Sequence, residues 1–176
     1  SFIKALGTIK YSAAVANQDL GNLTVKKAVA LKSSAKMVIT REVDDHFPLD
    51  VFQTGSGTST NMNANEVIAN LASKKLGSEV SPNDDVNMSQ SSNDVIPTAI
   101  KVSAHMDLTK KLFPALDKLI QITEKKASSL KGVVKTGRTH LMDAMPLDFS
   151  QEISAWIAQL KNSRKTLLFL ETRMME

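Results

Sequence analysis

Apolar residues near the start of the chain recur every three or four positions, which places them on one face of an α-helix. Gly21-Asn22 ends this first pattern, and Thr24 is a typical N-cap for a second helix with apolar residues as far as Val38. The segment from Asp44 to Pro48 then interrupts the pattern, because a residue before proline is pushed out of the α region. The sequence therefore predicts two amphipathic helices before Asp44. The apolar residues of the first are Phe2, Leu6, Ile9, Ala13, Ala16 and Leu20.

The same periodicity predicts three more helical segments. Residues 58–76 form the first, and Gly77 is its stop signal. The second runs from Asn93 to Leu130, with Pro97 in its first turn and Pro114 at a break or kink. The last extends over residues 148–176, where the apolar stripe consists of Ile153, Trp156, Ile157, Leu160, Leu167, Leu168 and Met174.

Polar segments separate these helices. Residues 78–93 read as an irregular loop, residues 133–140 as a short extended piece, and the segment from there to Pro146 as a further loop. Aromatic residues make up only 5% of the chain and glycines number 7, which argues against a sheet-rich fold. The predicted class is all-α, with long helices and polar loops. The chain begins without Met and stops inside a helical pattern, so we expect it to be a piece of a longer protein.

Composition excludes several classes of function. The 176 residues carry a net charge of +4, and no basic stripe is interleaved with aromatic residues, so nucleic acid is not indicated. Cysteine is absent and the three histidines are too dispersed for a recognised metal-ligand spacing, so no metal is expected. No apolar run approaches the ~18–20 residues of a membrane span, so no membrane association is expected.

Residues 54–66 (TGSGTSTNMNANE) combine two glycines with many neutral hydrogen-bond donors at the start of a helix. Glycine lets a ligand approach the backbone, and the unpaired N–H groups of a first helical turn attract anions. Ser56, Gly57 and Thr58 are therefore candidate ligands for a carboxylate or phosphate. The alternative is an ordinary helix N-terminus capped by Thr58 or Ser59. The segment is not a Walker A loop, because no lysine follows the glycines.

Two later segments repeat this chemistry. Residues 81–94 place Ser91, Ser92 and Asn93 at the start of a long helix, where their donors can bind an anion or simply cap the helix. Residues 137–146 contain Thr139 and His140, and an imidazole exchanges protons near neutral pH. A single histidine of this kind is more often an ordinary surface residue. Each segment alone is a weak signal, but the three occurring together are very improbable by chance.

In this order, the three segments resemble the fumarase/aspartase superfamily, and within it most closely the class II fumarate hydratases. The likeness covers nearly the whole chain. It implies an all-α, long-helix bundle of that superfamily's type, here truncated. It also implies a partial N-terminal helical domain at 1–50 and the first part of a central helical-bundle domain at 51–176. The matching pieces are residues 53–58 with 61–66, residues 82–87 with 89–94, and residues 137–140.

The family interconverts fumarate and L-malate by anti addition or removal of water, without metal or organic cofactor, and the resemblance implies this reaction for the parent of the chain. It also implies that His140 transfers a proton and that Thr139 contacts the substrate. A homotetramer is implied, in which each active site draws on three subunits. The implied location is the cytoplasm, or the mitochondrion if the source is eukaryotic. The residues matched to carboxylate binding are Ser56, Gly57, Thr58, Ser91, Ser92 and Asn93.

Two departures from the family pattern matter. The resemblance implies a second anion site at Ser81, Pro82, Asn83 and Asp84, but Ser81 stands where the family often has histidine, and no arginine is nearby. The family's Gly-Ser-Ser loop, which supplies the serine regarded as the catalytic base and a substrate-binding lysine, does not occur here. We therefore expect the 176 residues alone to be inactive.

Two other functions stay open at this point. One is elimination of ammonia from aspartate on the same scaffold; His140 argues against it, since aspartases usually carry Gln after the matching threonine. The other is a non-catalytic helical assembly piece. The missing base loop favours it, as do apolar helix stripes that need partners.

Overall fold

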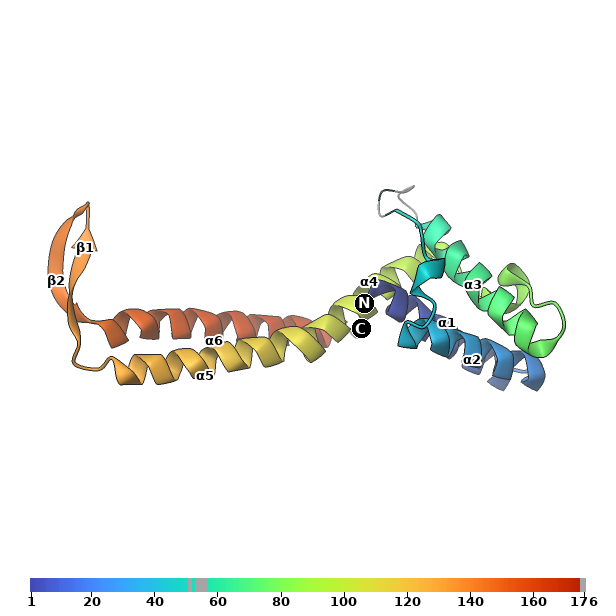
Figure 1. The fold of residues 1–176 in the computed structure, drawn as a ribbon, viewed down its shortest axis with the longest axis horizontal. Helices are drawn as coiled ribbons and strands as arrows, with labels where there is room; N and C mark the ends of the chain where they lie inside the picture. Colours follow the sequence, from blue (N-terminus) through green and yellow to red (C-terminus); the bar gives the residue numbers. More distant parts are fainter. Residues whose placement is uncertain (51, 53–56, 175–176) are drawn as a thin grey trace. The chain divides into compact units, whose positions relative to one another are not determined.

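The computed structural model describes residues 1–50, 52 and 57–174, which form two compact units, Ser1–Ala104 and His105–Glu176 (Figure 1). Both units consist mainly of helices, and the predicted all-α class is confirmed. None of the helices in this described part of the chain is long and apolar enough to cross a membrane. The expected domains at 1–50 and 51–176 stay a prediction.

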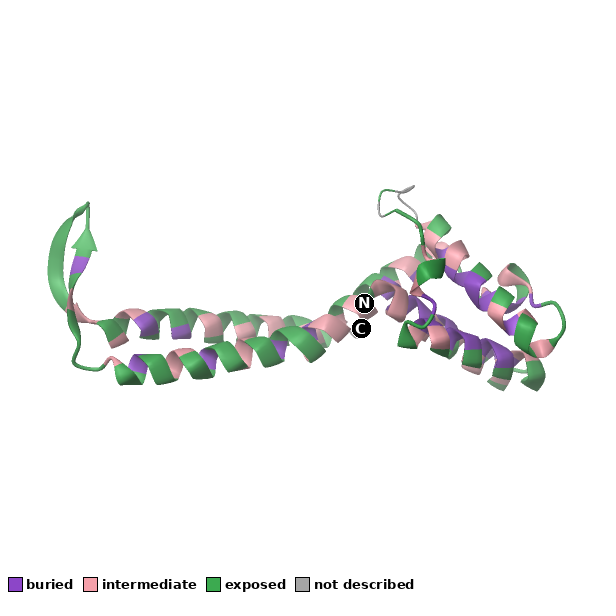
Figure 2. Cartoon of the chain, viewed as in Figure 1, coloured by how far each residue is buried: buried purple, intermediate pink, exposed green. Residues whose placement is uncertain are grey.

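Three helices form most of the core of the first unit, α1 (Phe2–Asp19), α2 (Val25–Thr40) and α3 (Thr58–Leu76), and Val95 and Ala99 of the next helix complete it. Leu6, Leu31 and Ile68 are the largest apolar side chains buried completely among them. Figure 2 shows that buried positions gather on the facing sides of these helices, as their apolar periodicity requires. A short 3₁₀ helix, η1 (Asp44–His46), lies in the predicted break.

The ends of α2 and α3 follow local sequence signals. Thr24 caps α2, and its hydroxyl accepts a hydrogen bond from the Lys27 backbone N–H at 3.4 Å. Gly77 ends α3 with φ at +70°, a left-handed conformation that costs glycine no steric strain. Both predicted signals are confirmed.

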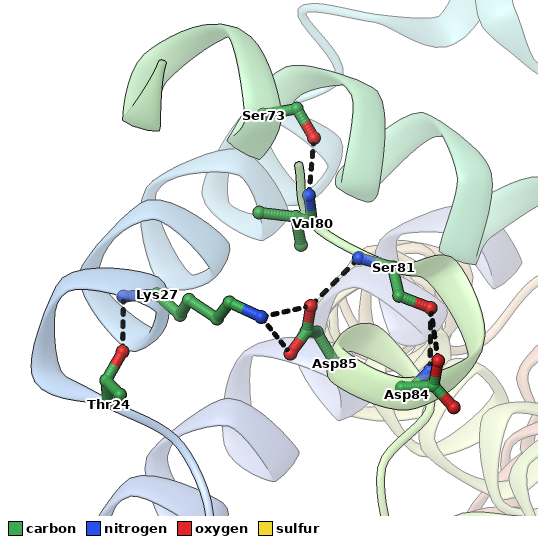
Figure 3. A network of polar contacts seen from close by, with 7 residues as sticks. All are labelled: Thr24, Lys27, Ser73, Val80, Ser81, Asp84 and Asp85. Carbon is green, nitrogen blue, oxygen red and sulfur yellow. Dashed lines mark hydrogen bonds and ion pairs between the residues drawn. The ribbon is translucent and has the colours of Figure 1, made fainter. Parts of the chain in front are cut away.

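The polar segment after α3 contains a single π-helical turn, η2 (Pro82–Val86), where an irregular loop was expected. A carboxylate anchors this turn to α2. Both oxygens of Asp85 lie 2.8 Å from Lys27 Nζ, and one of them also accepts from the Ser81 backbone N–H at 2.8 Å (Figure 3). The Val80 N–H donates to the Ser73 hydroxyl at 2.9 Å, which anchors the same segment to α3.

One of the two prolines in the next helical stretch does not lie where the sequence suggested. Pro97 is inside α4 (Ser92–Asp107) rather than in its first turn. Pro114 lies where a break or kink was expected, in the first turn of α5 (Phe113–Ser129), which directly follows a π-helical segment, η3 (Leu108–Leu112). Proline lacks an N–H and its ring crowds the preceding turn. A wider π turn accommodates that crowding without ending the helix.

The second unit pairs α5 with α6 (Phe149–Met174), which lie side by side (Figure 1). Ile120, Ala127, Ile153 and Ile157 form their buried contact. Arg164 Nε and Nη2 lie 2.5 and 3.0 Å from the two carboxylate oxygens of Asp117, a paired contact that holds the helices in register.

A β-hairpin joins α5 to α6, which corrects the expectation of a loop before Pro146. Strands β1 (Val134–Thr139) and β2 (Met142–Asp148) are antiparallel, with Thr139 opposite Met142. Most residues of β2 are exposed, so its sequence shows no alternation of apolar and polar positions. Proline is tolerated in β2 because a two-stranded ribbon leaves the outer side of each strand unpaired.

A capping box connects β2 to α6. The Asp148 carboxylate accepts from the Ser150 N–H at 2.7 Å, and the Asp148 N–H donates to Gln151 Oε1 at 2.9 Å. Hydrogen bonds from Ser150, assisted by one from Gly132, hold the pKa of Asp148 below its ordinary value. The base of the hairpin is therefore attached firmly to α6.

Replacing Lys27 by Met in the full-length protein is expected to lower the free energy of unfolding by about 1–3 kcal/mol. The cause is Asp85, whose side chain is only 9% exposed and would keep a charge without its partner. Urea unfolding followed by circular dichroism measures the change. Lys75→Met is the matched control, because exposed Lys75 bonds the Ser33 hydroxyl rather than a carboxylate. Equal losses in the two variants would contradict the anchoring role of Lys27.

Candidate functional site

The first predicted loop ends at Gly57, which is the N-cap of α3 with φ at +67°. Thr58 is the first residue of the helix, so the alternative in which Thr58 or Ser59 is the capping residue is wrong. Ser56 lies outside the described residues. The N-terminus of α3 therefore begins directly at two of the three candidate ligands, Gly57 and Thr58.

Gly57 packs against the start of α4. A Cβ atom at this position would lie 2.9 Å from Ile96 Cγ1, closer than side-chain atoms approach each other. The absence of a side chain thus allows the end of the first loop to touch the helix that follows the second loop.

The second loop presents its candidate ligands at the start of α4. The Ser91 hydroxyl accepts from the Asn93 N–H at 3.3 Å, and the Ser91 carbonyl accepts from the Val95 N–H at 2.9 Å. Ser91 and Asn93 are exposed, whereas Ser92 is half-buried. Ser92 Oγ accepts from Asn61 Nδ2 of α3 at 3.2 Å, so a direct hydrogen bond joins the two loop regions.

Buried carboxamides lie beneath these loops. Asn61 and Asn65 of α3 are 0% exposed, and the Nδ2 atom of each donates to Asn87 Oδ1 at 3.2 Å. The side-chain oxygens of Asn61 and Asn65 have no hydrogen-bond partner among the described residues. Both amides therefore turn their NH₂ groups toward Asn87.

Lys10 of α1 completes this network and was not identified from the sequence. Its side chain is 2% exposed, and its Nζ donates to Asn87 Oδ1 at 3.0 Å and to Gln90 Oε1 at 2.9 Å. Burial lowers the pKa of the Lys10 amine to about 8. A lysine between apolar helix positions normally points to solvent, so the sequence pattern carried no signal for it.

The third predicted segment lies at the tip of the hairpin in the second unit. Thr139 is the last residue of β1, and His140 and Leu141 form the two-residue turn with φ at +46° and +59°. All three are exposed. Gly57, Thr58 and the Ser91–Asn93 segment thus come together in the first unit, while Thr139 and His140 belong to the second. Among the described residues, no group of three or more His, Cys, Asp or Glu side chains could hold a metal ion.

The segment predicted as a second anion site uses its polar groups internally. The Ser81 hydroxyl donates to Asp84 Oδ2 at 2.9 Å and accepts from the Asp84 N–H at 3.0 Å (Figure 3). The nearby ammonium group of Lys27 is paired with Asp85. Anion binding at Ser81, Pro82, Asn83 and Asp84 stays a prediction.

Gly57→Ala is expected to destabilise the full-length protein more than Gly77→Ala. Both glycines have positive φ, so alanine brings about 1–2 kcal/mol of backbone strain at either position. Only the Gly57 variant also collides with Ile96, because nothing lies within 4 Å of a Cβ at Gly77. Thermal unfolding measures both variants. In an Ile96→Ala background, the penalty of Gly57→Ala should shrink; an unchanged penalty would show that the collision is not its cause.

Comparison with known proteins supports the resemblance seen in the sequence. The family model described as "Lyase" matches residues 2–176. The class II fumarate hydratase of Thermus aquaticus is 54% identical over 166 residues, covering 92% of this chain and 36% of the relative. The corresponding protein of Xylella fastidiosa (strain Temecula1 / ATCC 700964) is 52% identical and covers 94% of this chain and 35% of the relative. The chain thus spans about a third of the length of these curated relatives.

Among solved structures, the recombinant class II fumarase of Schistosoma mansoni matches with a TM-score of 0.90 and 40% identity. That match covers 93% of this chain and 36% of the solved one. The fold match and the sequence matches thus point to the same group of proteins. The chain therefore belongs to the lyase family, and the similar proteins named here are class II fumarate hydratases.

Proposed function

We propose that the protein containing this chain hydrates fumarate reversibly to L-malate. The observation that carries the proposal is the meeting of two donor-rich helix N-termini in one unit. Gly57 begins α3 in contact with Ile96 of α4, and Asn61 of α3 donates to Ser92. The names of the class II fumarate hydratase relatives provide independent support.

The donors suit a reaction that gathers charge on a carboxylate. Removing a proton from the carbon next to a carboxylate builds a second negative charge on that group. Neutral donors that are already held in position strengthen their hydrogen bonds as this charge forms. The positive ends of two helix dipoles add to the attraction. We assign this binding role to Ser56, Gly57, Thr58, Ser91, Ser92 and Asn93.

We assign proton transfer to His140 and a substrate contact to Thr139. Imidazole can give a proton to the departing hydroxyl group or poise a water molecule for addition. His140 is exposed at a hairpin tip, where its positive φ is uncommon for a residue other than glycine. Backbone strain of this kind clusters at functional sites, which favours a chemical role over a role in folding.

We propose that the full protein is a homotetramer, so that Thr139 and His140 can meet the first-unit donors of other copies. The helices of the second unit expose large apolar side chains, as expected for helices that pack against partners. We propose a cytoplasmic location, or a mitochondrial one in a eukaryote. The exposed apolar side chains on α5 and α6 include Leu119, Ile122, Trp156, Leu168, Phe169 and Leu170.

The purified full-length protein is expected to form fumarate from L-malate and not from L-aspartate. The site offers an imidazole to protonate a leaving hydroxyl group, whereas elimination of ammonia needs no such proton from the enzyme when the amine is already protonated. The ultraviolet absorbance of fumarate reports both reactions at equal protein concentration. Fumarate from aspartate alone would replace the proposal by ammonia elimination, and no product from either would favour an assembly role.

His140→Asn in the full-length protein is expected to lower kcat for malate dehydration by about 100-fold or more, the usual size of general acid–base effects. Asparagine tolerates positive φ, so the hairpin turn should persist. Leu141→Asn is the matched control, because Leu141 shares the turn, has φ at +59° and is fully exposed. Similar kinetics of the two variants would remove His140 from the mechanism.

A further inference from the structure

Lys10 is buried without an opposing charge. Lys10 and Asp85 are the charged residues among the buried ones in the described part of the chain. Asp85 pairs with Lys27, whereas Lys10 makes no ion pair with any described residue. Burying an unpaired ammonium group costs free energy unless hydrogen bonds compensate. Among the described residues, the acceptors of the Lys10 amine are neutral: the side-chain oxygens of Asn87 and Gln90.

The ammonium group determines which way the Asn87 carboxamide faces. Ammonium has three donors and no acceptor, so Asn87 must present its oxygen to Lys10. The Asn87 NH₂ group then faces the other way and donates to the Gln90 carbonyl at 3.1 Å. With its oxygen directed inward, Asn87 can accept from Asn61 and Asn65 and cannot donate to them.

The orientation of the Asn87 carboxamide also determines which hydrogen bond Ser92 receives. Because Asn87 offers an oxygen, Asn61 turns its NH₂ group toward it, and the same NH₂ group donates to Ser92 Oγ. A serine hydroxyl has a single hydrogen. With its oxygen accepting from Asn61, that hydrogen is left to donate to another acceptor.

We propose that Lys10 is a positioning residue for the carboxylate site: through the carboxamides of Asn87 and Asn61, its ammonium group orients the Ser92 hydroxyl as a donor to the substrate. This inference rests on the proposed function. Lys10 also supplies positive charge to a network that ends at the site, while residues 54–66 and 81–94 contain no Lys or Arg of their own. Without the ammonium, either end of Asn87 could face Asn61. The Ser92 hydroxyl could then donate its hydrogen to the Asn61 side-chain oxygen instead of to the substrate.

The test compares Lys10→Met with Lys32→Met in the full-length protein. Lys32 is a matched control because its Nζ also bonds a neutral carboxamide, Gln18 Oε1 at 2.9 Å, and joins α1 to α2 without contacting Asn87. Lys10→Gln keeps a donor without the charge. Steady-state kinetics give KM and kcat for fumarate, thermal unfolding gives the stability of each variant, and neutron crystal structures locate the hydrogens of Asn61 and Ser92.

Lys10→Met is expected to raise the KM for fumarate about 10-fold or more and to lower kcat as well, since Ser92 holds the carboxylate in the ground state and binds it more strongly as charge forms in the transition state. Lys10→Gln should recover part of the loss, and Lys32→Met should leave KM unchanged. Equal KM values for Lys10→Met and Lys32→Met would overturn the inference. So would a Lys10→Met crystal structure that keeps the donation from Asn61 to Ser92.

Two further outcomes have their own tests: a Lys10→Met variant that does not fold, and a wild-type protein that does not convert fumarate. If Lys10→Met does not fold, Asn61→Asp tests the hydrogen bond between residue 61 and Ser92 instead, with a side chain of almost the same volume. Its carboxylate cannot donate to Ser92 and draws the hydroxyl hydrogen inward, so KM should rise; an unchanged KM in folded Asn61→Asp would overturn the inference. If the wild-type protein does not convert fumarate, the proposed function fails. The crystal comparison of Lys10→Met with the wild type then decides the inference by itself.

Discussion

The arrangement of the first unit depends on the side-chain oxygen of one half-buried carboxamide, Asn87 Oδ1. It accepts hydrogen bonds from Lys10 of α1 and from Asn61 and Asn65 of α3. A buried polar group without a partner costs about 1–3 kcal/mol, so the three donors and the oxygen stabilise one another only in this arrangement. The polar segment that carries Asn87 is thereby held between two helices although most of it is not helical itself.

This constraint joins two helix N-termini, to which we assign carboxylate binding. Gly57 opens α3 and Ser91–Asn93 open α4, and both regions are attached to the same network through Asn61 and Ser92. The candidate donors at these ends are neutral, and the buried ammonium of Lys10 belongs to the network attached to them. Fixed neutral donors above a single buried cation favour a ligand that carries more negative charge in its transition state than in its ground state.

The second unit has a different feature, an exposed hairpin that is held by two paired helices. Its base is attached to α6 by the hydrogen bonds of Asp148 with Ser150 and Gln151, and α6 is tied to α5 by Arg164 and Asp117. The tip has two consecutive residues with positive φ, neither of them glycine. A rigid base with a strained tip is suited to presenting a side chain such as that of His140, to which we assign proton transfer, at a distance from its own helices.

The sequence by itself determined the helices α1, α2 and α3, the signals at Thr24 and Gly77, and the three polar segments, because periodicity and capping depend on residues close together in the chain. It did not predict β2, whose exposed faces leave no alternating pattern, or the π turn before Pro114. Only the tertiary structure decided that Gly57 meets Ile96 and that Lys10 is buried against Asn87, 77 positions away in the sequence. Contacts between residues so far apart depend on how the helices pack, and no local pattern of residues encodes that packing.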